Sequence, residues 1–386
     1  MSFPFEQIDP TKTRVLKSSS KYLIFSCEAG GTSFVIKIAH THHEQLTREV
    51  ERIQSLKQAY PVLGRRLPSI VASGAIPTGL HAGKAYYAQE YLSGKTFSHV
   101  LQSGLVPSAT FSKAVSTLVR TLCDLTLEHQ CDEAFYGQSG SFLREAVIGA
   151  YRQAVAFPHI NHVDQCEDLV INGTRMAPLK DVLQRIVSSP ILARIERGPS
   201  CISSLGHWNF HGDNILLESV ERAADVRVID PDTKIEQGDP LFGLARFFYT
   251  FPHDTADYGQ YVIHSSMMTR LQTGTADMDI TCLWPHVVYE QYQIFSRAFL
   301  DAQELISLDA RFADERLRAR LILNMLLCLL RGVSANYDEA IEFVEGSGTA
   351  FRHKGIFFYL QACLFASTIL EKEVMKISHH ETAYVG

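Results

Sequence analysis

The stretch Leu205–Leu217 reads LGHWNFHGDNILL, and its pattern is the strongest indication of the fold of this chain. Its first half is dense in imidazole, amide and carboxylate side chains, and its end is a short apolar strand. A second apolar strand follows in Val226–Asp232 (VRVIDPD) and ends in carboxylates, before Gly238–Ala245 (GDPLFGLA) starts a helix. A hairpin between the two strands sets Asn214 and Asp230 side by side. Oxygen ligands at adjacent strand ends suit Mg²⁺, which binds one or two carboxylates together with nucleotide phosphates.

The first ninety or so residues predict strands and one helix. Tyr22–Cys27 and Thr32–Ile38 are short, β-rich runs separated by EAGG, whose glycine pair is typical of a hairpin turn. From Thr41 to about Tyr60 the apolar residues recur at helical spacing. Ala85–Leu92 is another strand candidate. We expect a small lobe built on an antiparallel sheet with one helix.

The remainder of the chain predicts mainly helices. Helical periodicity covers Phe111–Glu128 and Leu179–Ile195, and two strongly apolar stretches, Leu317–Leu330 and Ile356–Leu370, suit core helices. The segment His129–Gly173 has no clear period and is expected to be irregular. The fold class is therefore α+β, with a small lobe over residues 1–93 and a large, mostly helical lobe over residues 94–386.

Bulk properties exclude several function classes. The 386 residues carry a formal net charge of −6, which argues against a nucleic-acid partner. No basic start precedes an apolar run, and the longest apolar stretch is far shorter than the ~20 residues of a membrane helix, so we expect a cytoplasmic protein. The cysteines are scattered without a C-x-x-C pair and are expected to be reduced and mostly buried: Cys27, Cys123, Cys131, Cys166, Cys201, Cys282, Cys328 and Cys363.

These segments together resemble the aminoglycoside phosphotransferase and choline kinase superfamily, whose signature is H-x-D-x-x-x-x-N, an I-D-x-D/E strand end and a G-D-P-x-x-D-L-A helix start. The resemblance covers about residues 16–245. It implies a protein-kinase-like, two-lobed fold that binds ATP and Mg²⁺. The implied metal ligands are Asn214 and Asp230, with Asp232 either a third ligand or a cap of the next segment.

The N-terminal part supports the same resemblance. Phe34–Ile38 (FVIKI) looks like the strand that bears the phosphate-binding lysine, here Lys37, and Glu49 lies where the family has the paired glutamate. The resemblance also implies nucleotide contacts from a phosphate-covering loop and from an adenine-binding hinge. The residues at these places are Ser18, Ser19 and Ser20 in the loop, and Gln89, Glu90 and Tyr91 in the hinge.

Two positions depart from the family pattern. The H-x-D motif becomes His207-Trp-Asn209, so an amide replaces the catalytic base, and Gly243 replaces the aspartate that braces the catalytic loop. His207 is expected to brace the loop by hydrogen bonds. An intact H-G-D at 211–213 offers a second register, but that register puts Glu218 at the asparagine position. We prefer the first register, in which Asp213 takes the role of base or acceptor-positioning group, with Asn209 hydrogen-bonding to it.

The resemblance implies transfer of the ATP γ-phosphoryl group to a hydroxyl. The acceptor is either a small molecule, such as an antibiotic, amino alcohol or sugar, or Ser/Thr of a peptide in natural-product biosynthesis, where a partner lyase would follow. The irregular segment 129–173 is expected to help shape the acceptor site. The alternative is a catalytically impaired pseudokinase that acts as a nucleotide- or peptide-binding partner protein. Neither alternative involves nucleic acid or a membrane.

Overall fold

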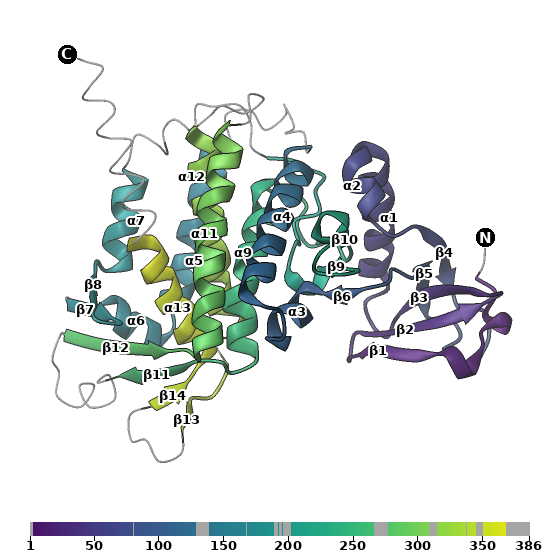
Figure 1. The fold of residues 1–386 in the computed structure, drawn as a ribbon, viewed down its shortest axis with the longest axis horizontal. Helices are drawn as coiled ribbons and strands as arrows, with labels where there is room; N and C mark the ends of the chain where they lie inside the picture. Colours follow the sequence, from purple (N-terminus) through teal and green to yellow (C-terminus); the bar gives the residue numbers. More distant parts are fainter. Residues whose placement is uncertain are drawn as a thin grey trace.

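The computed structural model confirms the α+β fold, with an antiparallel sheet in the N-terminal region and a mainly helical C-terminal part (Figure 1). The structure describes residues 3–79, 81–128, 139–166, 168–188, 192, 195, 202–265, 277–308, 315–336, 338–344 and 350–367. Parts of the predicted segments 129–173, 179–195 and 356–370 lie outside these residues, as do Cys131 and Cys201. The other six cysteines are free and buried, as predicted.

The N-terminal sheet has five antiparallel strands in the order β1-β2-β3-β5-β4. The predicted hairpin is present, because Gly30 and Gly31 take the positive φ angles of 59° and 79° that a tight turn requires. Two short 3-10 turns, η1 and η2, precede the sheet. The bounds are η1 (Phe5–Gln7), η2 (Pro10–Lys12), β1 (Arg14–Ser18), β2 (Tyr22–Ala29), β3 (Thr32–Ala39), β4 (Ile70–Ala75) and β5 (Ala85–Glu90).

Helix α1 (His43–Ala59) packs on this sheet and is followed by α2 (Pro61–Arg66). The predicted apolar face of α1 is buried, since Leu46, Val50, Ile53 and Leu56 are all inaccessible to solvent or nearly so. Glu49 lies on the same face and is buried with them. An acidic side chain in this position needs a partner, and the partner comes from the neighbouring strand.

A small three-stranded sheet connects the two parts of the chain. Its order is β10-β9-β6, from β10 (Arg227–Val228), β9 (Ile215–Leu217) and β6 (Lys95–Thr96). β6 leads into α3 (Phe97–Ser103), and η5 (Ala223–Asp225) lies between β9 and β10. Gly94 approaches β9 so closely that a Cβ at this position would lie 2.5 Å from the carbonyl oxygen of Leu217. The chain can enter the C-terminal part along this path because residue 94 has no side chain.

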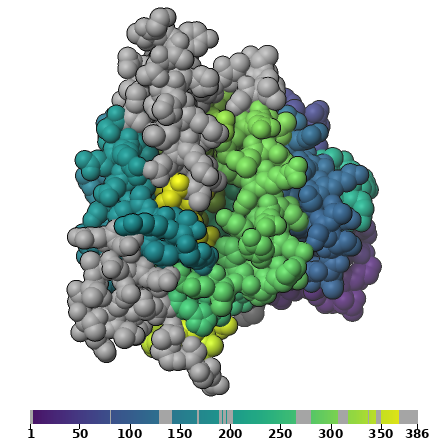
Figure 2. All heavy atoms as spheres, turned by 60° about the vertical axis from the view of Figure 1, so that its left-hand side comes forward, coloured from purple at the N-terminus to yellow at the C-terminus, as the bar shows by residue number. Residues whose placement is uncertain are grey.

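The C-terminal part is organised around α12, which packs against α5, α9, α11 and α13. Figure 2 shows that the outer face of this part joins segments from distant regions of the chain, with teal, green and yellow side by side. Its helices are α4 (Ser108–Leu127), α5 (Ser139–Val155), α6 (Pro158–Asp164), α7 (Leu179–Val187), α9 (Leu241–Asp257), α11 (His286–Leu308), α12 (Glu315–Ala335) and α13 (Lys354–Phe365).

Two secondary-structure predictions for the C-terminal part are wrong. The segment 129–173 is not simply irregular, since it contains α5, α6 and a strand. The remainder of the chain is not made of helices alone, because a six-stranded sheet runs along one end, in the order β13-β14-β11-β12-β7-β8. These strands are short: β7 (Asp168–Ile171), β8 (Thr174–Met176), β11 (Val262–Ser265), β12 (Asp277–Leu283), β13 (Glu342–Phe343) and β14 (Ala350–Arg352).

Long-range pairing explains why these strands gave no clear signal. β7 and β12 pair in parallel, with Asp168 opposite Asp277, although they lie far apart in sequence. β7 has four residues, too few for a period of two to stand out, and β12 has seven, but its pairing with β7 is not recorded in any local pattern. In the part of the chain that the structure describes, no helix has the length and apolar character needed to cross a membrane.

Candidate functional site

Lys37 of β3 lies at the centre of the site and contacts two carboxylates. Its ammonium Nζ donates to Glu49 Oε2 of α1 at 2.7 Å and to Asp230 Oδ1 at 3.0 Å. The Tyr87 hydroxyl, from the strand that pairs with β3, donates to Glu49 Oε1 at 2.5 Å. The Tyr22 ring lies beneath the ammonium, 4.8 Å from its centroid. The predicted Lys37 and Glu49 side chains are therefore brought together, and a residue from the C-terminal part joins them.

The two carboxylates of this cluster have pKa values that shift in opposite directions. Burial alone would lower the pKa of Lys37, but the charges of Glu49 and Asp230 raise it. Burial, with the Asp230 charge, raises the pKa of Glu49 to about 7, against the opposing effect of Lys37. Burial acts to raise the pKa of Asp230, but Lys37 outweighs it and that pKa is lowered. The Asp230 side chain is 49% exposed, so we assign the negative charge to Asp230 in preference to Glu49, and a ligand can reach it there.

Asn214 and Asp230 lie next to each other, as the hairpin predicts. Val228 pairs with Ile215, and the Ile229 peptide N–H donates to the Asn214 carbonyl at 3.0 Å. Asp230 has a φ of 53°, a left-handed conformation that is uncommon for a residue other than glycine and concentrates at functional sites. A carboxylate and an amide oxygen at the ends of two paired strands are a donor set that Mg²⁺ accepts.

Asp232 adopts the capping role that the sequence left open. Its Oδ1 accepts from the Lys234 peptide N–H at 2.8 Å, and its own N–H donates to the His207 carbonyl at 2.9 Å. His207 is fully buried, and its ring stacks on Phe210 at 4.7 Å between centroids. Its Nδ1 accepts from the Asn209 peptide N–H at 3.3 Å. His207 thus lies where it can brace the loop, as predicted.

One face of α9 holds the loop that carries Asn209 and Asp213. Arg246 donates from a terminal nitrogen to Asn209 Oδ1 at 3.0 Å. One turn further along the helix, Thr250 Oγ1 accepts from the Gly212 peptide N–H at 2.9 Å. The side-chain nitrogen of Asn209 donates to the Asp230 carbonyl at 2.9 Å. The amide at the position of the usual base therefore joins α9 to the backbone of Asp230.

The predicted contact between Asn209 and Asp213 is absent. The Asn209 amide faces Arg246 and Asp230 instead, and Asn214 donates to the Asn209 carbonyl at 3.2 Å. Asp213 lies in the single turn η4 (Gly212–Asn214), with an exposed side chain. Sequence spacing alone could not place these side chains, since the direction of each depends on α9, which follows later in the chain.

The two positions that depart from the family pattern lie close together, because Gly243 packs against the loop that carries Asn209. A Cβ on Gly243 would lie 3.1 Å from the Phe210 ring and 3.4 Å from the Trp208 backbone. Trp208, whose φ is 51°, is buried and lies beneath the Arg52 guanidinium at 4.9 Å. A side chain at 243 would require the Phe210 ring to shift by a few tenths of an ångström. The loop is held by packing and by Arg246 in place of that carboxylate.

The second register of the motif is not supported by this geometry. Glu218 follows β9 rather than preceding it, and its exposed carboxylate accepts from Arg222 at 2.7 Å within the connection between β9 and β10. Asn214, in contrast, directly precedes β9 and lies beside Asp230. The arrangement therefore agrees with the register in which Asn209 stands at the base position.

The serine loop and the hinge lie at opposite ends of β3, since Tyr22 pairs with Ala39 whereas Glu90 pairs with Phe34. Ser19 closes the turn between β1 and β2, because its hydroxyl accepts from the Tyr22 peptide N–H at 3.1 Å. Ser18 and Ser20 are exposed. In the hinge, the peptide N–H of Glu90 donates to Ser69 and that of Tyr91 donates to Ser33. These N–H groups are already used, so an adenine contact at these two residues would fall to their carbonyl groups.

The remaining hinge side chains have structural contacts. Gln89 is buried in β5, and Glu90 Oε1 accepts from Arg227 at 2.6 Å. The sequence predicted no role for Arg227, Arg246 or Tyr87. No signal in the sequence distinguishes these residues from other arginines and tyrosines, because each reaches the site from an element that lies far away along the chain.

No family model matches the chain, and no curated protein matches it. Among solved structures, aminoglycoside phosphotransferase APH(4)-Ia, as the apo form of a thermostable mutant, is 12% identical, with 97% of this chain and 96% of that chain covered and a TM-score of 0.40. Spectinomycin phosphotransferase APH(9)-Ia, in complex with ADP and spectinomycin, is 9% identical, with 92% of each chain covered and a TM-score of 0.40.

Proposed function

We propose that this protein is an ATP-dependent phosphotransferase that moves the γ-phosphoryl group to a hydroxyl. The observation that carries the proposal is the buried ion cluster of Lys37, Glu49 and Asp230, with Asn214 beside it. Lys37 is held at 2.7 and 3.0 Å by carboxylates from two distant parts of the chain. A buried ammonium kept charged, next to an exposed carboxylate and an amide, suits the phosphates and metal of a nucleotide.

The donor set fits Mg²⁺ and ATP. Asp230 and Asn214 would hold the metal, and Lys37, positioned by Glu49, would orient the phosphates, whereas Asp232 caps the following segment. Bound MgATP supplies the phosphoryl group and neutralises the charge that develops during transfer. The loop Ser18–Ser20 would cover the phosphates, and the carbonyl groups of the hinge would meet the adenine. We also propose that the chain divides into two lobes, residues 1–93 and 94–386, because it enters the C-terminal part at Gly94.

Asp213 is our proposed group for meeting the acceptor hydroxyl. Its carboxylate is exposed at the start of β9 and close enough to Asp254 and Tyr258 to influence the pKa of both. A carboxylate beside the metal ligand Asn214 can position a hydroxyl without being a strong base, because phosphoryl transfer depends chiefly on positioning and charge neutralisation. We propose a small-molecule alcohol as the acceptor. Peptide Ser/Thr, with a partner lyase, is the second acceptor class.

A specific observation favours the alternative of an impaired pseudokinase. Both ends of the Asn209 side-chain amide are hydrogen-bonded, the oxygen to Arg246 and the nitrogen to the Asp230 carbonyl. This side chain is therefore a structural link and not a base. In this alternative the ion cluster still binds nucleotide, but no phosphoryl group is transferred. Binding and turnover must therefore be measured separately.

Binding is tested by the shift in melting temperature that ATP produces with and without Mg²⁺. Ligand at a hundredfold excess over Kd adds about 2.7 kcal/mol to the free energy of unfolding. We expect a Mg²⁺-dependent shift in the wild type that is lost in Lys37→Met and kept in Lys113→Met, which removes an exposed lysine of α4. No shift in the wild type would contradict the nucleotide site.

Turnover is tested by transfer of labelled phosphate to a panel of small alcohols and Ser/Thr peptides. We expect Asp230→Ala to abolish transfer, whereas Asp213→Asn keeps the nucleotide shift and loses most of the transfer. Full activity in Asp230→Ala would refute the metal assignment. Nucleotide binding without transfer to any acceptor would favour the pseudokinase alternative.

A further inference from the structure

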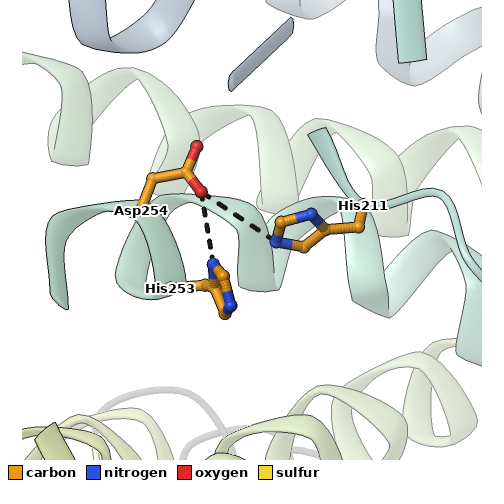
Figure 3. Close-up of side chains that lie close together, drawn as sticks. All are labelled: His211, His253 and Asp254. Atoms are coloured by element: carbon orange, nitrogen blue, oxygen red, sulfur yellow. Dashed lines mark hydrogen bonds and ion pairs between the residues drawn. The ribbon is translucent and has the colours of Figure 1, made fainter. Parts of the chain in front are cut away.

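A second cluster of ligand-type side chains shares no residue with the ion cluster, and it consists of His211, His253 and Asp254. Figure 3 shows His211 reaching from the loop toward α9, which contributes the other two side chains. Asp254 Oδ1 lies 3.3 Å from His253 Nδ1 and 4.0 Å from His211 Nε2. One ligand atom from each of the three residues lies within 4.8 Å of the other two. The two imidazole rings meet edge to face at 4.4 Å.

Ordinary hydrogen bonding leaves this cluster incomplete. His211 is 7% exposed and Asp254 is 3% exposed, yet His211 Nε2 and Asp254 Oδ2 meet no partner at hydrogen-bonding distance among the described residues. The Ser98 hydroxyl, which is likewise buried without a partner at that distance, lies close enough to Asp254 to act against the burial that raises its pKa. A separation of 4.0 Å between nitrogen and oxygen is too long for a hydrogen bond. Buried polar atoms without partners are uncommon in folded proteins, and a missing ion is one explanation for them. Both orphaned groups belong to side chains of the same cluster.

We propose that His211, His253 and Asp254 bind a divalent transition-metal ion of the Zn²⁺ class. Two imidazoles and one carboxylate are a donor set that such ions prefer, with an open position for water or another ligand. Metal–ligand bonds of about 2.0–2.2 Å put neighbouring ligand atoms roughly 3.3–3.5 Å apart in a tetrahedral site. The pair formed by His253 and Asp254 already has this spacing. His211 Nε2, at 4.0 Å from Asp254 Oδ1, must approach that oxygen by roughly 0.5 Å and His253 by up to about 1.5 Å, which a side-chain rotation allows.

Groups around the cluster favour this assignment. His253 Nε2 faces Asp257 Oδ2 at 3.6 Å, and Lys354 pairs with Asp257 at 3.2 Å. A carboxylate behind a histidine is the usual outer partner of a metal-binding imidazole, because it orients the ring and makes it more basic. Burial, together with His253 and Arg246, lowers the pKa of His211 to about 2, so this imidazole stays neutral as a ligand must.

The protonation of His211 sets one condition on metal binding. The Asp213 peptide N–H donates to His211 Nδ1 at 3.4 Å, so the proton of the neutral ring is on Nε2 in this arrangement. A metal bound at Nε2 requires the tautomer with its proton on Nδ1. That nitrogen could then no longer accept from the Asp213 N–H, so metal binding would break this long, weak hydrogen bond. The ion would tie the loop to α9 two residues before Asp213. It shares no ligand with Asn214 and Asp230, and the inference does not rest on the proposed phosphotransferase function.

The test is a titration of the chelator-treated, full-length protein with Zn²⁺, followed by calorimetry, with Co²⁺ absorption as an independent readout. We expect one equivalent to bind to the wild type. His253→Asn and Asp254→Asn should weaken binding by about a hundredfold or more, and Asp257→Asn by roughly tenfold. His253 is 30% exposed, so His253→Asn is expected to fold, which its circular dichroism spectrum and urea midpoint would check.

Two control variants separate this site from other histidines of the chain. His99→Asn removes an exposed histidine of α3, and the double variant His379→Asn/His380→Asn removes a neighbouring pair near the C-terminus. Both should bind Zn²⁺ as the wild type does. X-ray absorption at the zinc edge of the wild type should show two imidazoles and no sulfur, and this result depends on no variant. Absent binding, unchanged binding in His253→Asn, or sulfur ligation would each overturn the proposal.

Discussion

Removing the Asp239 carboxylate should strongly destabilise the protein, because Asp239 forms a buried ion pair with the Arg320 guanidinium. This carboxylate is 1% exposed, accepts from Arg320 at 2.7 and 2.9 Å, and also accepts from the Leu241 peptide N–H at 2.9 Å. Breaking a buried ion pair by deleting one partner costs about 3–5 kcal/mol. With the lost bond at the start of α9, we expect Asp239→Ala to lower the free energy of unfolding by about 4 kcal/mol.

Urea denaturation followed by circular dichroism measures this loss. Asp239→Asn keeps an acceptor for Leu241 and removes the charge, so its loss should be about 2 kcal/mol, between the wild type and Asp239→Ala. The paired change Asp239→Leu/Arg320→Met should cost only about 1 kcal/mol, because it leaves no guanidinium short of its carboxylate. A loss below about 1 kcal/mol in Asp239→Ala, or a paired variant less stable than the single one, would refute the reasoning.

Three further predictions concern the loop, a helix cap and the hinge. Asn209→Asp should not raise phosphoryl transfer, since Arg246 at 3.0 Å would hold the new carboxylate and the bond to the Asp230 carbonyl would be lost; a tenfold gain in a transfer assay would contradict this. His353 caps α13 by accepting from Ile356 at 3.1 Å, and burial with nearby His159 lowers its pKa against the opposing effect of Glu339. The unfolded chain therefore binds more protons below the ordinary value of 6.5, and stability should fall with decreasing pH, by at most about 1.4 kcal/mol per pH unit. His353→Asn should flatten that dependence in urea midpoints measured from pH 7.5 down to about 5.5. Gly94→Ala combines a φ of 131° with the 2.5 Å clash at Leu217, so it should cost about 2–3 kcal/mol in thermal unfolding, whereas Gly79→Ala, which meets nothing within 4 Å, should cost about 1 kcal/mol.

Local patterns in the sequence were enough to predict the backbone elements that carry the N-terminal half of the site, whereas the family resemblance singled out Lys37 and Glu49 on them. The hairpin of Gly30 and Gly31, the strand of Lys37 and the helix of Glu49 depend on neighbours within a few residues, and periodicity is reliable at that range. The adjacency of Asn214 and Asp230 was likewise predictable, because a hairpin pairs strands that follow each other. These elements needed only turn chemistry and the alternation of apolar side chains.

Long-range packing placed the rest of the site. Arg246 contacts Asn209, and Asp254 and His253 approach His211, because α9 crosses the loop that precedes it by many residues. The C-terminal sheet likewise depends on β7 meeting β12 across several intervening helices. Sequence specifies such contacts only through the packing of the whole core, and no local spacing records them. The order of amino acids therefore reveals which chemical groups are present and how their local backbone runs, whereas the packed core sets which of those groups face one another.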